Sequence, residues 1–357
     1  MAESTLAARA DGVVDLLVER ELDCLLVTDL VNVRYLSGFT GTNGACVVSR
    51  EQRQFVTDFR YVEQAREQVR GFQLVKGERD LLGDIAKRLH GRAGFDDAHV
   101  SVRTHRKLLE AVDEGVELIE AAGVVERLRE VKDEEELRAI ADATELADEV
   151  YELLRERGMA GRTERDVARE LEGELRARGA EPSFPPIVAS GPHAALPHAV
   201  PRDAKIERGT LVIVDMGARL DGYCSDCTRT FATGELDGRA AELYQLVRSA
   251  QGAALGAVRA GAGCAEVDAA ARDLIETAGE GDRFGHGVGH GVGLEVHEAP
   301  RLAKTAEGEL DAGNVVTVEP GVYLPGELGV RIEDLVAVTD DGASIMTSFP
   351  KELIVLD

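Results

Sequence analysis

The sequence predicts two domains, an α/β domain over residues 1–125 and an α+β domain over residues 126–357. In the first part, segments with helical apolar spacing alternate with short apolar segments that predict strands. In the second part, two long helical segments come first, and strands dominate from Pro186 onward. A chain of 357 residues is long enough for two domains of ordinary size.

The N-terminal domain begins with a predicted helix over residues 8–21, where Val13, Leu16 and Leu17 repeat at helical spacing. An apolar strand follows at residues 23–28, and a Gly-rich turn at 41–44 leads into a predicted hairpin. No cluster of reactive side chains stands out in this domain. The other predicted elements are strands at 45–49, 54–57, 73–75 and 116–119 and helices at 62–69 and 81–89.

The second domain opens with a predicted helix over residues 133–157, which starts with acidic residues and stops at Gly158. We place the domain boundary near residues 122–132. A second helix is predicted from Thr163, a suitable N-cap, to Gly179, and the Pro-rich segment after it ends the helical region. Two further helices, at 238–259 and 264–278, interrupt the strands.

The composition restricts the partners of this protein. A net charge of −25 argues against nucleic acid or an anionic membrane surface, because both require basic patches. No run of 18 apolar residues occurs, and the N-terminus lacks the basic-then-apolar order of a signal peptide. We therefore expect a soluble protein of the cytoplasm.

The five cysteines are an odd and sparse set, which fits reduced thiols. Cys224 and Cys227 form a CxxC pattern that would suit a redox pair or a zinc site. On a strand, however, residues three apart point to opposite faces, so these two sulfurs would not converge. We therefore disfavour both interpretations.

The most informative segment is a predicted hairpin that carries Asp215 and Asp226. If Leu220 and Asp221 pair across the turn, Asp215 lies directly opposite Asp226. If Asp221 and Gly222 form a two-residue loop, Asp215 faces Thr228 and Asp226 is its diagonal neighbour. Either register leaves both carboxylates on one face, about 5 to 8 Å apart. Buried like charges at this spacing repel each other unless a cation lies between them.

A second hairpin repeats this arrangement with glutamates. An apolar strand ends at Glu319, and the chain returns with Glu333 in Arg331-Ile-Glu333-Asp. A loop of odd length centred near Gly326 would place Glu319 across from Glu333. One acid in an apolar strand is often a satisfied edge residue, but four acids in two such hairpins indicate a metal site.

Between the two hairpins lies GHGVGHGVGLEVHE, which contains His286, His290 and His297. Its alternating glycines rule out a regular helix, so this is not a helical HExxH site. Such glycine density lets the backbone approach a ligand or another strand closely.

One imidazole and four carboxylates suit a pair of divalent cations better than a structural zinc site. Paired ions would lower the pKa of a bridging water, so that hydroxide forms near neutral pH. The candidate ligands are Asp215, Asp226, His290, Glu319 and Glu333.

This order of ligands resembles the pita-bread metallopeptidases, which include methionine aminopeptidase, aminopeptidase P and prolidase. Residues 1–125 resemble the creatinase-type N-terminal domain, so the resemblance covers essentially the whole chain. It implies an α/β N-terminal domain followed by an α+β pita-bread catalytic domain. It also implies a homodimer.

The resemblance implies a role for each matched residue. Asp215 would bind one metal, His290 and Glu319 the other, while Asp226 and Glu333 would bridge both. Glu319 would also pass a proton to the leaving nitrogen. His198 and His297 match catalytic histidines that contact the substrate, and the remaining substrate-binding positions are His286, Arg331 and Tyr223.

The creatinase-like first domain favours an exopeptidase that hydrolyses Xaa-Pro bonds in dipeptides or short peptides. Among the divalent ions, we expect Mn²⁺ or Co²⁺ ahead of Zn²⁺ or Fe²⁺. The overall length and the short loop after Glu319 favour an Xaa-Pro dipeptidase (prolidase) over aminopeptidase P. Creatinase itself is disfavoured, because its site does not keep these ligands. The alternatives from other classes are a non-catalytic peptide-binding module and a metal-independent C–N hydrolase. The apolar residues expected to contact the proline ring are Phe184, Pro185, Pro186, Ile187, Leu196 and Tyr323.

Overall fold

The structure is a computed structural model that describes residues 3–356. The chain divides into two compact units, residues 1–129 and residues 130–357. No helix among the described residues combines the length and apolarity needed to cross a bilayer.

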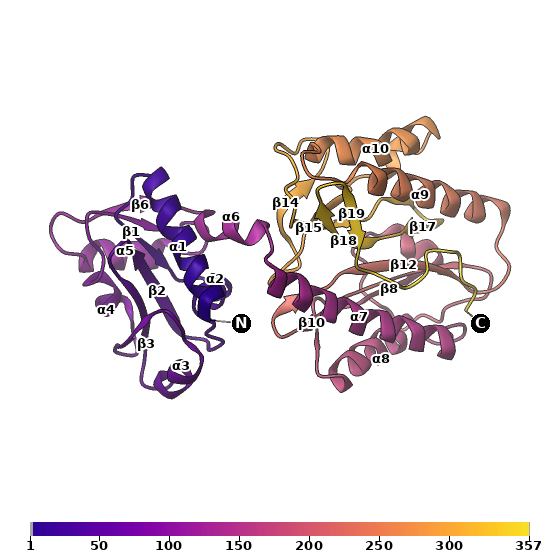
Figure 1. The fold of residues 1–357 in the computed structure, drawn as a ribbon. Helices are drawn as coiled ribbons and strands as arrows, with labels where there is room; N and C mark the ends of the chain where they lie inside the picture. The colour runs from indigo at the N-terminus through magenta and orange to yellow at the C-terminus, as the bar shows by residue number, and fades with distance from the viewer. Residues whose placement is uncertain (1–2, 357) are drawn as a thin grey trace. The chain divides into compact units, whose positions relative to one another are not determined.

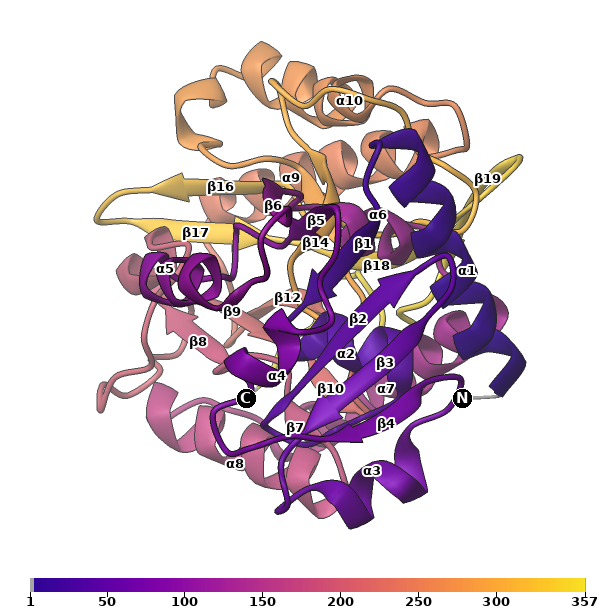
Figure 2. The same ribbon diagram turned by 90° about the vertical axis from the view of Figure 1, so that its left-hand side faces the viewer.

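The N-terminal unit is built on one six-stranded sheet of order β4-β3-β2-β1-β5-β6. Strand β2 is antiparallel to both β1 and β3, while the other neighbouring strands run parallel. Figure 2 shows β2, β3 and β4 side by side. The strands are β1 (Cys24–Val27), β2 (Gly44–Ser49), β3 (Arg53–Thr57), β4 (Gln73–Lys76), β5 (Arg92–Phe95) and β6 (Glu117–Glu120).

Helices cover both faces of this sheet. Figure 1 shows α1 and α2 on one side and α4 and α5 on the other. On the second side, Ile85 and Leu108 pack against Leu26 and Val47 of the strands. The helices of this unit are α1 (Glu3–Glu19), α2 (Leu30–Ser37), α3 (Val62–Gln68), α4 (Leu82–Ala86), α5 (Val102–Ala111) and α6 (Val124–Glu130).

The predicted alternation of helices and strands is confirmed in this unit, but α2, β5, α5 and α6 were not predicted. The signals for α2 are present in the sequence: the Asp29 side chain accepts a hydrogen bond from Asn32 N, and Gly38 closes the helix with φ 81°. The helix is short and polar residues interrupt its apolar spacing, so only its caps mark it.

The C-terminal unit contains four long helices, and its first two begin as the sequence predicts. Asp133 and Glu136 form a capping box at the start of α7, and the Thr163 side chain caps α8 by accepting from Asp166 N. The helices are α7 (Glu134–Arg157), α8 (Glu164–Ala177), α9 (Gly238–Ala257) and α10 (Cys264–Thr277), with short 3₁₀ segments η1 (Gly191–Ala195) and η2 (Gly281–Arg283).

Two helix pairs enclose the strands of this unit (Figure 1). The pair α7 and α8 packs on one sheet, where Tyr151 contacts Val214 and Phe231 in the core. The pair α9 and α10 packs on the strands that follow it, through residues such as Val247 and Val316. The side chains that lie between the α7–α8 pair and the α9–α10 pair are therefore packed from both sides.

The strands of the C-terminal unit form one five-stranded, two three-stranded and one two-stranded sheet. Their bounds are β7 (Glu181–Pro182), β8 (Ile187–Ser190), β9 (Leu211–Met216), β10 (Ala218–Leu220), β11 (Tyr223–Cys224), β12 (Cys227–Ala232), β13 (Gly289–Gly291), β14 (Glu298–Leu302), β15 (Val315–Val318), β16 (Gly321–Leu324), β17 (Leu328–Arg331), β18 (Asp334–Thr339) and β19 (Gly342–Ile345).

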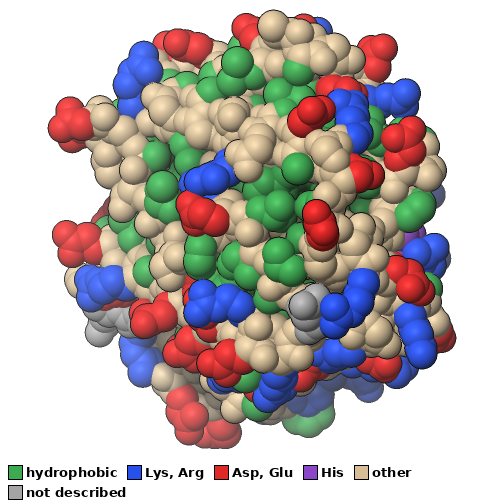
Figure 3. All heavy atoms as spheres, turned by 90° about the vertical axis from the view of Figure 1, so that its right-hand side faces the viewer, with side chains coloured by type: hydrophobic (Ala, Val, Ile, Leu, Met, Phe, Trp, Pro, Cys, Tyr) green, Lys and Arg blue, Asp and Glu red, His purple; other side chains and the backbone are tan. Residues whose placement is uncertain are grey.

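The charged side chains are mixed on the face drawn in Figure 3. Acidic and basic groups lie interspersed around apolar ones there. The net charge of −25 is therefore not concentrated on that face, and no continuous basic patch covers it.

Candidate metal centre

The first hairpin adopts the register in which Asp221 and Gly222 form the loop. Leu220 pairs with Tyr223, and Asp215 pairs with Thr228. Both loop residues have positive φ, 47° for Asp221 and 85° for Gly222, as a type I′ turn requires. Asp226 therefore follows as the diagonal neighbour of Asp215, and the expectation that both carboxylates share one face is confirmed.

The second hairpin has the odd loop that the sequence predicts. Leu324 pairs with Leu328, and the same register continues to Gly321 opposite Arg331. On the other side of the glutamates, Val318 pairs with Asp334. Both pairings place Glu319 across from Glu333, as predicted.

The glycine-rich segment brings His290 to these carboxylates. A Cβ on Gly289 would lie 1.9 Å from the carbonyl oxygen of Thr317, so only glycine permits this close approach of β13 to β15. Nδ1 of His290 donates to the carbonyl of Gly291 at 3.0 Å. This contact turns Nε2 toward the site, 3.3 Å from Glu319 Oε1 and 3.7 Å from Asp226 Oδ2.

All five candidate ligands line one cavity of about 630 Å³. Potential ligand atoms of Asp226, His290 and Glu333 lie within 4.8 Å of one another. The five groups come from β9, the residue before β12, β13 and the two sides of the second hairpin. Residues more than 100 positions apart in sequence thus meet in one small volume.

Electrostatic repulsion in this group is only partly compensated by the protein. Burial raises the pKa of Asp226 and of Glu333 well above their usual values, and neighbouring carboxylates add to both shifts. Burial would raise the pKa of Glu319 as well, but the hydrogen bond from His290 and nearby positive charge lower it to about 2. The protein therefore lacks the positive charge needed to keep all four carboxylates ionised, and a bound cation would supply it.

Two buried oxygen atoms identify where such a cation would be needed. Asp215 Oδ1 and Glu333 Oε1 are buried and accept no hydrogen bond within the described part of the chain. Buried carboxylate oxygens are ordinarily satisfied, so an unsatisfied pair facing one cavity fits bound metal. Carboxylate and imidazole ligands suit Mn²⁺, Fe²⁺, Co²⁺ or Zn²⁺.

Arg331 is the cation that the protein itself supplies to this site. Its guanidinium donates to Asp215 Oδ2 at 2.6 Å, to the Tyr323 hydroxyl at 2.9 Å and to Thr228 Oγ1 at 3.0 Å. It also donates to the carbonyl of Pro197 at 3.1 Å. Arg331 is 4% exposed, and these four contacts hold its guanidinium against Asp215 and fix the orientation of that carboxylate.

The predicted substrate-contacting histidines also line the cavity. His198 and His297 are exposed, whereas Nε2 of His286 lies 3.0 Å from the Tyr323 hydroxyl. The His297 ring is 4.3 Å from that of His290. Burial, followed by the charge of His290, lowers the pKa of His297. The neutral form of His297 is therefore favoured beside the metal ligands.

The structure does not bring Tyr223 to this group. Its side chain is buried, and its hydroxyl donates to Glu136 Oε1 at 3.1 Å. Tyr223 is absent from the lining of the cavity and ties the first hairpin to α7 instead. The sequence places it one residue after the turn but does not indicate which layer its side chain enters.

One wall of the cavity is apolar. Of the apolar residues expected there, Leu196 and Tyr323 are not part of the lining, but Phe184, Pro185, Pro186 and Ile187 are. The sequence interpretation missed other lining residues, namely Pro197, Ala199, Val200, Pro201 and Val296.

Arg301 was also missed, and it supplies a positive charge to the lining. It is exposed on β14, and within residues 3–356 its guanidinium has no ion-pair partner. The only sequence signal is its place four residues after His297. The cavity thus has acidic groups, an apolar wall and a guanidinium.

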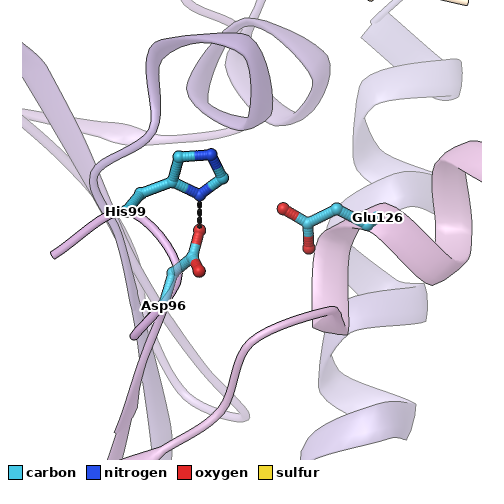
Figure 4. Close-up of side chains that lie close together, drawn as sticks. All are labelled: Asp96, His99 and Glu126. Atoms are coloured by element: carbon cyan, nitrogen blue, oxygen red, sulfur yellow. Dashed lines mark hydrogen bonds and ion pairs between the residues drawn. The ribbon is translucent and has the colours of Figure 1, made fainter. Parts of the chain in front are cut away.

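The N-terminal unit contains a second group of potential metal ligands, Asp96, His99 and Glu126 (Figure 4). The protein itself supplies partners for these side chains. Asp96 Oδ2 is 2.7 Å from His99 Nδ1, and Glu126 accepts a hydrogen bond from Asn32 Nδ2. We therefore interpret this group as a hydrogen-bonded contact that needs no cation.

The five cysteines are free and buried. Cys224 Sγ approaches the carbonyl of Leu294, while Cys227 Sγ approaches that of Glu333. The two thiols have separate partners and lie on different strands, β11 and β12.

The fold and this carboxylate site together define a metallopeptidase. The chain belongs to metallopeptidase family M24, whose model matches residues 138–340. The model of the creatinase/prolidase N-terminal domain matches residues 9–131. The expected architecture, a creatinase-type domain followed by a pita-bread catalytic domain, is confirmed.

Several relatives are similar over nearly their full length. The chain is 36% identical over 356 residues to an Xaa-Pro dipeptidase of Pyrococcus furiosus, covering 97% of this chain and 99% of the relative. It resembles the structure of an Xaa-Pro dipeptidase from Bacillus anthracis at 40% identity, with a TM-score of 0.96 and coverage of 98% and 100%. An X-Pro aminopeptidase from Thermotoga maritima is similar at 33% identity, with a TM-score of 0.89 and coverage of 97% and 99%.

Proposed function

We propose that this protein is an Xaa-Pro dipeptidase that uses two divalent metal ions. The observation that carries the proposal is the convergence of His290 and four carboxylates, of which Asp215, Asp226 and Glu333 are buried and two have unsatisfied oxygens. The proposal includes Mn²⁺ or Co²⁺ as the ions and a homodimer in the cytoplasm. The ions and the homodimer rest on the family resemblance, and the location rests on the composition. It also takes residues 1–125 and 126–357 as the two domains.

Asp215, Asp226, His290, Glu319 and Glu333 would hold the ions. Ions bound there supply Lewis-acid chemistry, polarising a carbonyl and lowering the pKa of a water molecule. Arg331 holds Asp215 through its 2.6 Å contact, so Asp215 is oriented before any ion binds. The orientation of His290 is likewise fixed by its bond to Gly291.

Other side chains manage protons and developing charge. Glu319, at the end of β15 and beside His290, receives a proton and passes it to the leaving nitrogen. His198 and His297 donate hydrogen bonds to the substrate, and so stabilise negative charge on the carbonyl oxygen. His286 lines the cavity and contacts the Tyr323 hydroxyl. Because the same hydroxyl accepts from Arg331, Tyr323 connects His286 with Arg331.

The apolar wall suits a proline ring. The imide nitrogen of an Xaa-Pro bond carries no N–H, so the site must recognise the ring by shape and apolar contact. Phe184, Pro185, Pro186 and Ile187 provide such a surface next to the ligands.

Arg301 supports a dipeptidase in particular. Its guanidinium is exposed on the cavity lining, whereas that of Arg331 is buried and already donates to Tyr323 and Asp215. In a dipeptide, the C-terminal carboxylate lies one residue beyond the scissile bond, and a guanidinium is the group best suited to bind it. A longer peptide places a neutral amide at that position.

The test uses Ala-Pro, Ala-Pro-amide and Ala-Pro-Ala with protein that has been stripped and reloaded with Mn²⁺, Co²⁺ or Zn²⁺. We expect hydrolysis of Ala-Pro at a rate far above those of the amide and the tripeptide. Arg301→Met should lower kcat/KM for Ala-Pro by about 10- to 100-fold, because it removes a charge-assisted hydrogen bond. It should leave the residual rate on the amide unchanged.

An Xaa-Pro aminopeptidase is the second candidate, favoured by the full-length similarity to the Thermotoga maritima enzyme. Hydrolysis of Ala-Pro-Ala but not of Ala-Pro would select it. Binding of Ala-Pro without cleavage at any metal loading would instead select a non-catalytic peptide-binding protein. Full activity in chelator would select a metal-independent hydrolase.

A further inference from the structure

The segment that carries His198 is fastened at both ends to a single buried carboxylate. We define the His198 loop as residues 191–201, between the end of β8 and Arg202. Pro197, His198, Ala199, Val200 and Pro201 of this loop line the cavity. The loop thus forms one side of the substrate site, although only η1 within it is regular structure.

Glu164, the first residue of α8, makes this attachment. Its Oε1 accepts from the backbone N–H and the hydroxyl of Ser190, both at 2.9 Å, just before the loop. Its Oε2 accepts from His193 Nδ1 at 2.9 Å, inside the loop. Arg202, just after the loop, donates its backbone N–H at 3.1 Å and two guanidinium N–H groups at 3.3 Å.

The burial of Glu164 makes these contacts consequential. Its side chain is 0% exposed, and six donors converge on its two oxygens. Burial disfavours the charged form, but the hydrogen bonds from Arg202 and Ser190 outweigh it and lower the pKa of Glu164. The group is therefore a buried carboxylate that accepts at every position, and it has no unsatisfied oxygen to offer a ligand.

We infer that Glu164 is a positioning residue that holds the His198 loop against the cavity and thereby fixes His198 toward the substrate. It touches neither the cavity nor the candidate metal ligands, so its effect on catalysis passes through the loop. Arg331 supports the middle of the same loop through Pro197. Backbone pairing also holds each end, through Ser190 with Val212 and through Arg165 N with the Arg202 carbonyl, but Glu164 is the side chain that joins the two ends. This inference rests on the role proposed above for His198.

The critical variant is Glu164→Gln, which keeps the shape of the side chain. A carboxamide has one acceptor oxygen and one NH₂ group. The donors that bond to the oxygen replaced by NH₂ would therefore face another donor. We expect the ends of the loop to loosen. Amide hydrogen exchange of residues 191–201 should rise at least about 10-fold, while exchange in α7 and α9 stays unchanged.

A double-mutant cycle separates positioning from general destabilisation. Glu164→Gln should lower kcat/KM for Ala-Pro by about 10- to 100-fold in the wild-type background. In a His198→Ala background the same substitution should cost less than about 3-fold, because there is no longer an imidazole to position. Asp58→Asn, a buried carboxylate of the N-terminal unit, is the matched control and should have the same effect in both backgrounds.

The inference is overturned if Glu164→Gln lowers kcat/KM by the same factor in both backgrounds, or if exchange in residues 191–201 does not change. Wild-type kinetics of His198→Ala would overturn it too, since His198 would then have no function to position. If the wild-type protein cleaves no Xaa-Pro peptide at all, the proposed function fails. In that case the exchange measurement still decides whether Glu164 holds the loop.

Discussion

Buried carboxylates occur in both units of this chain, and their surroundings differ in kind. In the N-terminal unit, Asp58 is 0% exposed and accepts hydrogen bonds from the side chains of Arg60 and Asn43. Its hydrogen bonds to Arg60 lower the pKa of Asp58. In the C-terminal unit, Asp226 and Glu333 are nearly as buried, yet their pKa values are raised by burial and by their neighbours.

The difference distinguishes a carboxylate that stabilises the fold from one that is kept for a ligand. Asp58 and Glu164 have donors on both oxygens, so each burial is compensated within the protein. Asp215 and Glu333 each keep an oxygen without a donor. Asp148 also has a buried oxygen without a donor, although its other oxygen accepts from Ser348 and it lies outside the cavity lining. The metal centre is therefore identified by the convergence of several such carboxylates and an imidazole on one cavity.

The largest expected effect is on catalysis. Glu333→Gln removes one negative charge and one shared metal ligand while keeping the side-chain shape. We expect kcat for Ala-Pro to fall by at least about 1,000-fold and bound metal to fall below two ions per chain, as measured by elemental analysis. Asp58→Asn should retain full metal content. Full activity of the Glu333 variant would contradict the assignment of this site.

Replacing Asp226 and Asp58 by asparagine should change the free energy of unfolding in opposite directions. In metal-stripped protein at pH 8, Asp226→Asn should raise the free energy of unfolding by about 1 to 3 kcal/mol, because it removes an uncompensated buried charge. Asp58→Asn should lower it by about 1 to 3 kcal/mol, because it breaks charge-assisted hydrogen bonds. Urea unfolding measures both, and a loss of stability in both variants would remove the distinction between the two carboxylates.

The pH dependence follows from the direction of each pKa shift. Because the pKa of Asp58 is lowered on folding, its contribution to stability is present above the unfolded value of about 3.9 and is lost as pH falls through the folded pKa. Because the pKa of Asp226 is raised, the stripped wild-type protein gains stability as pH falls from the folded pKa toward about 3.9.

Unfolding of the two variants at several pH values checks this expectation. The advantage of Asp226→Asn over the stripped wild type should be greatest at high pH and should shrink as the solution is acidified. The deficit of Asp58→Asn should be constant above about pH 5 and should disappear only in stronger acid. Identical pH profiles for the two variants would refute the assigned directions.

The smallest expected effect concerns another buried carboxylate, Glu136, which is 3% exposed and accepts from Asp133 N and the Tyr223 hydroxyl. Tyr223→Phe should lower the free energy of unfolding by about 0.5 to 1.5 kcal/mol through the lost hydrogen bond. It should change kcat/KM by less than about 2-fold, since Tyr223 lies outside the cavity lining. A large rise in KM alone would restore Tyr223 as a substrate contact.

Much of the candidate site could be predicted because strand alternation is a local property. The parity of Asp215 and Asp226 follows from the turn between them, although the sequence left two registers open. The Asp221-Gly222 loop and the odd loop after Leu324 then fixed both hairpins. The same local reasoning missed α2, because a short helix with interrupted apolar spacing is marked only by its caps.

Arg301 and Glu164 could not have been recognised in this way. Arg301 is one of many exposed basic residues until β14 places it on the cavity lining. Glu164 resembles an ordinary acid in the first turn of a helix until Ser190, His193 and Arg202 converge on it. Their roles depend on contacts between segments that lie far apart in the sequence.

The sequence by itself determined which carboxylates share a face within each hairpin, because side chains alternate over a few bonds and short turns set the register. Only the tertiary structure decided that the two hairpins and His290 meet in one cavity, with Arg331 on one aspartate and an apolar wall beside them. The physical reason is that these contacts arise from packing of two helix pairs around the strands, which brings together residues that no local rule connects.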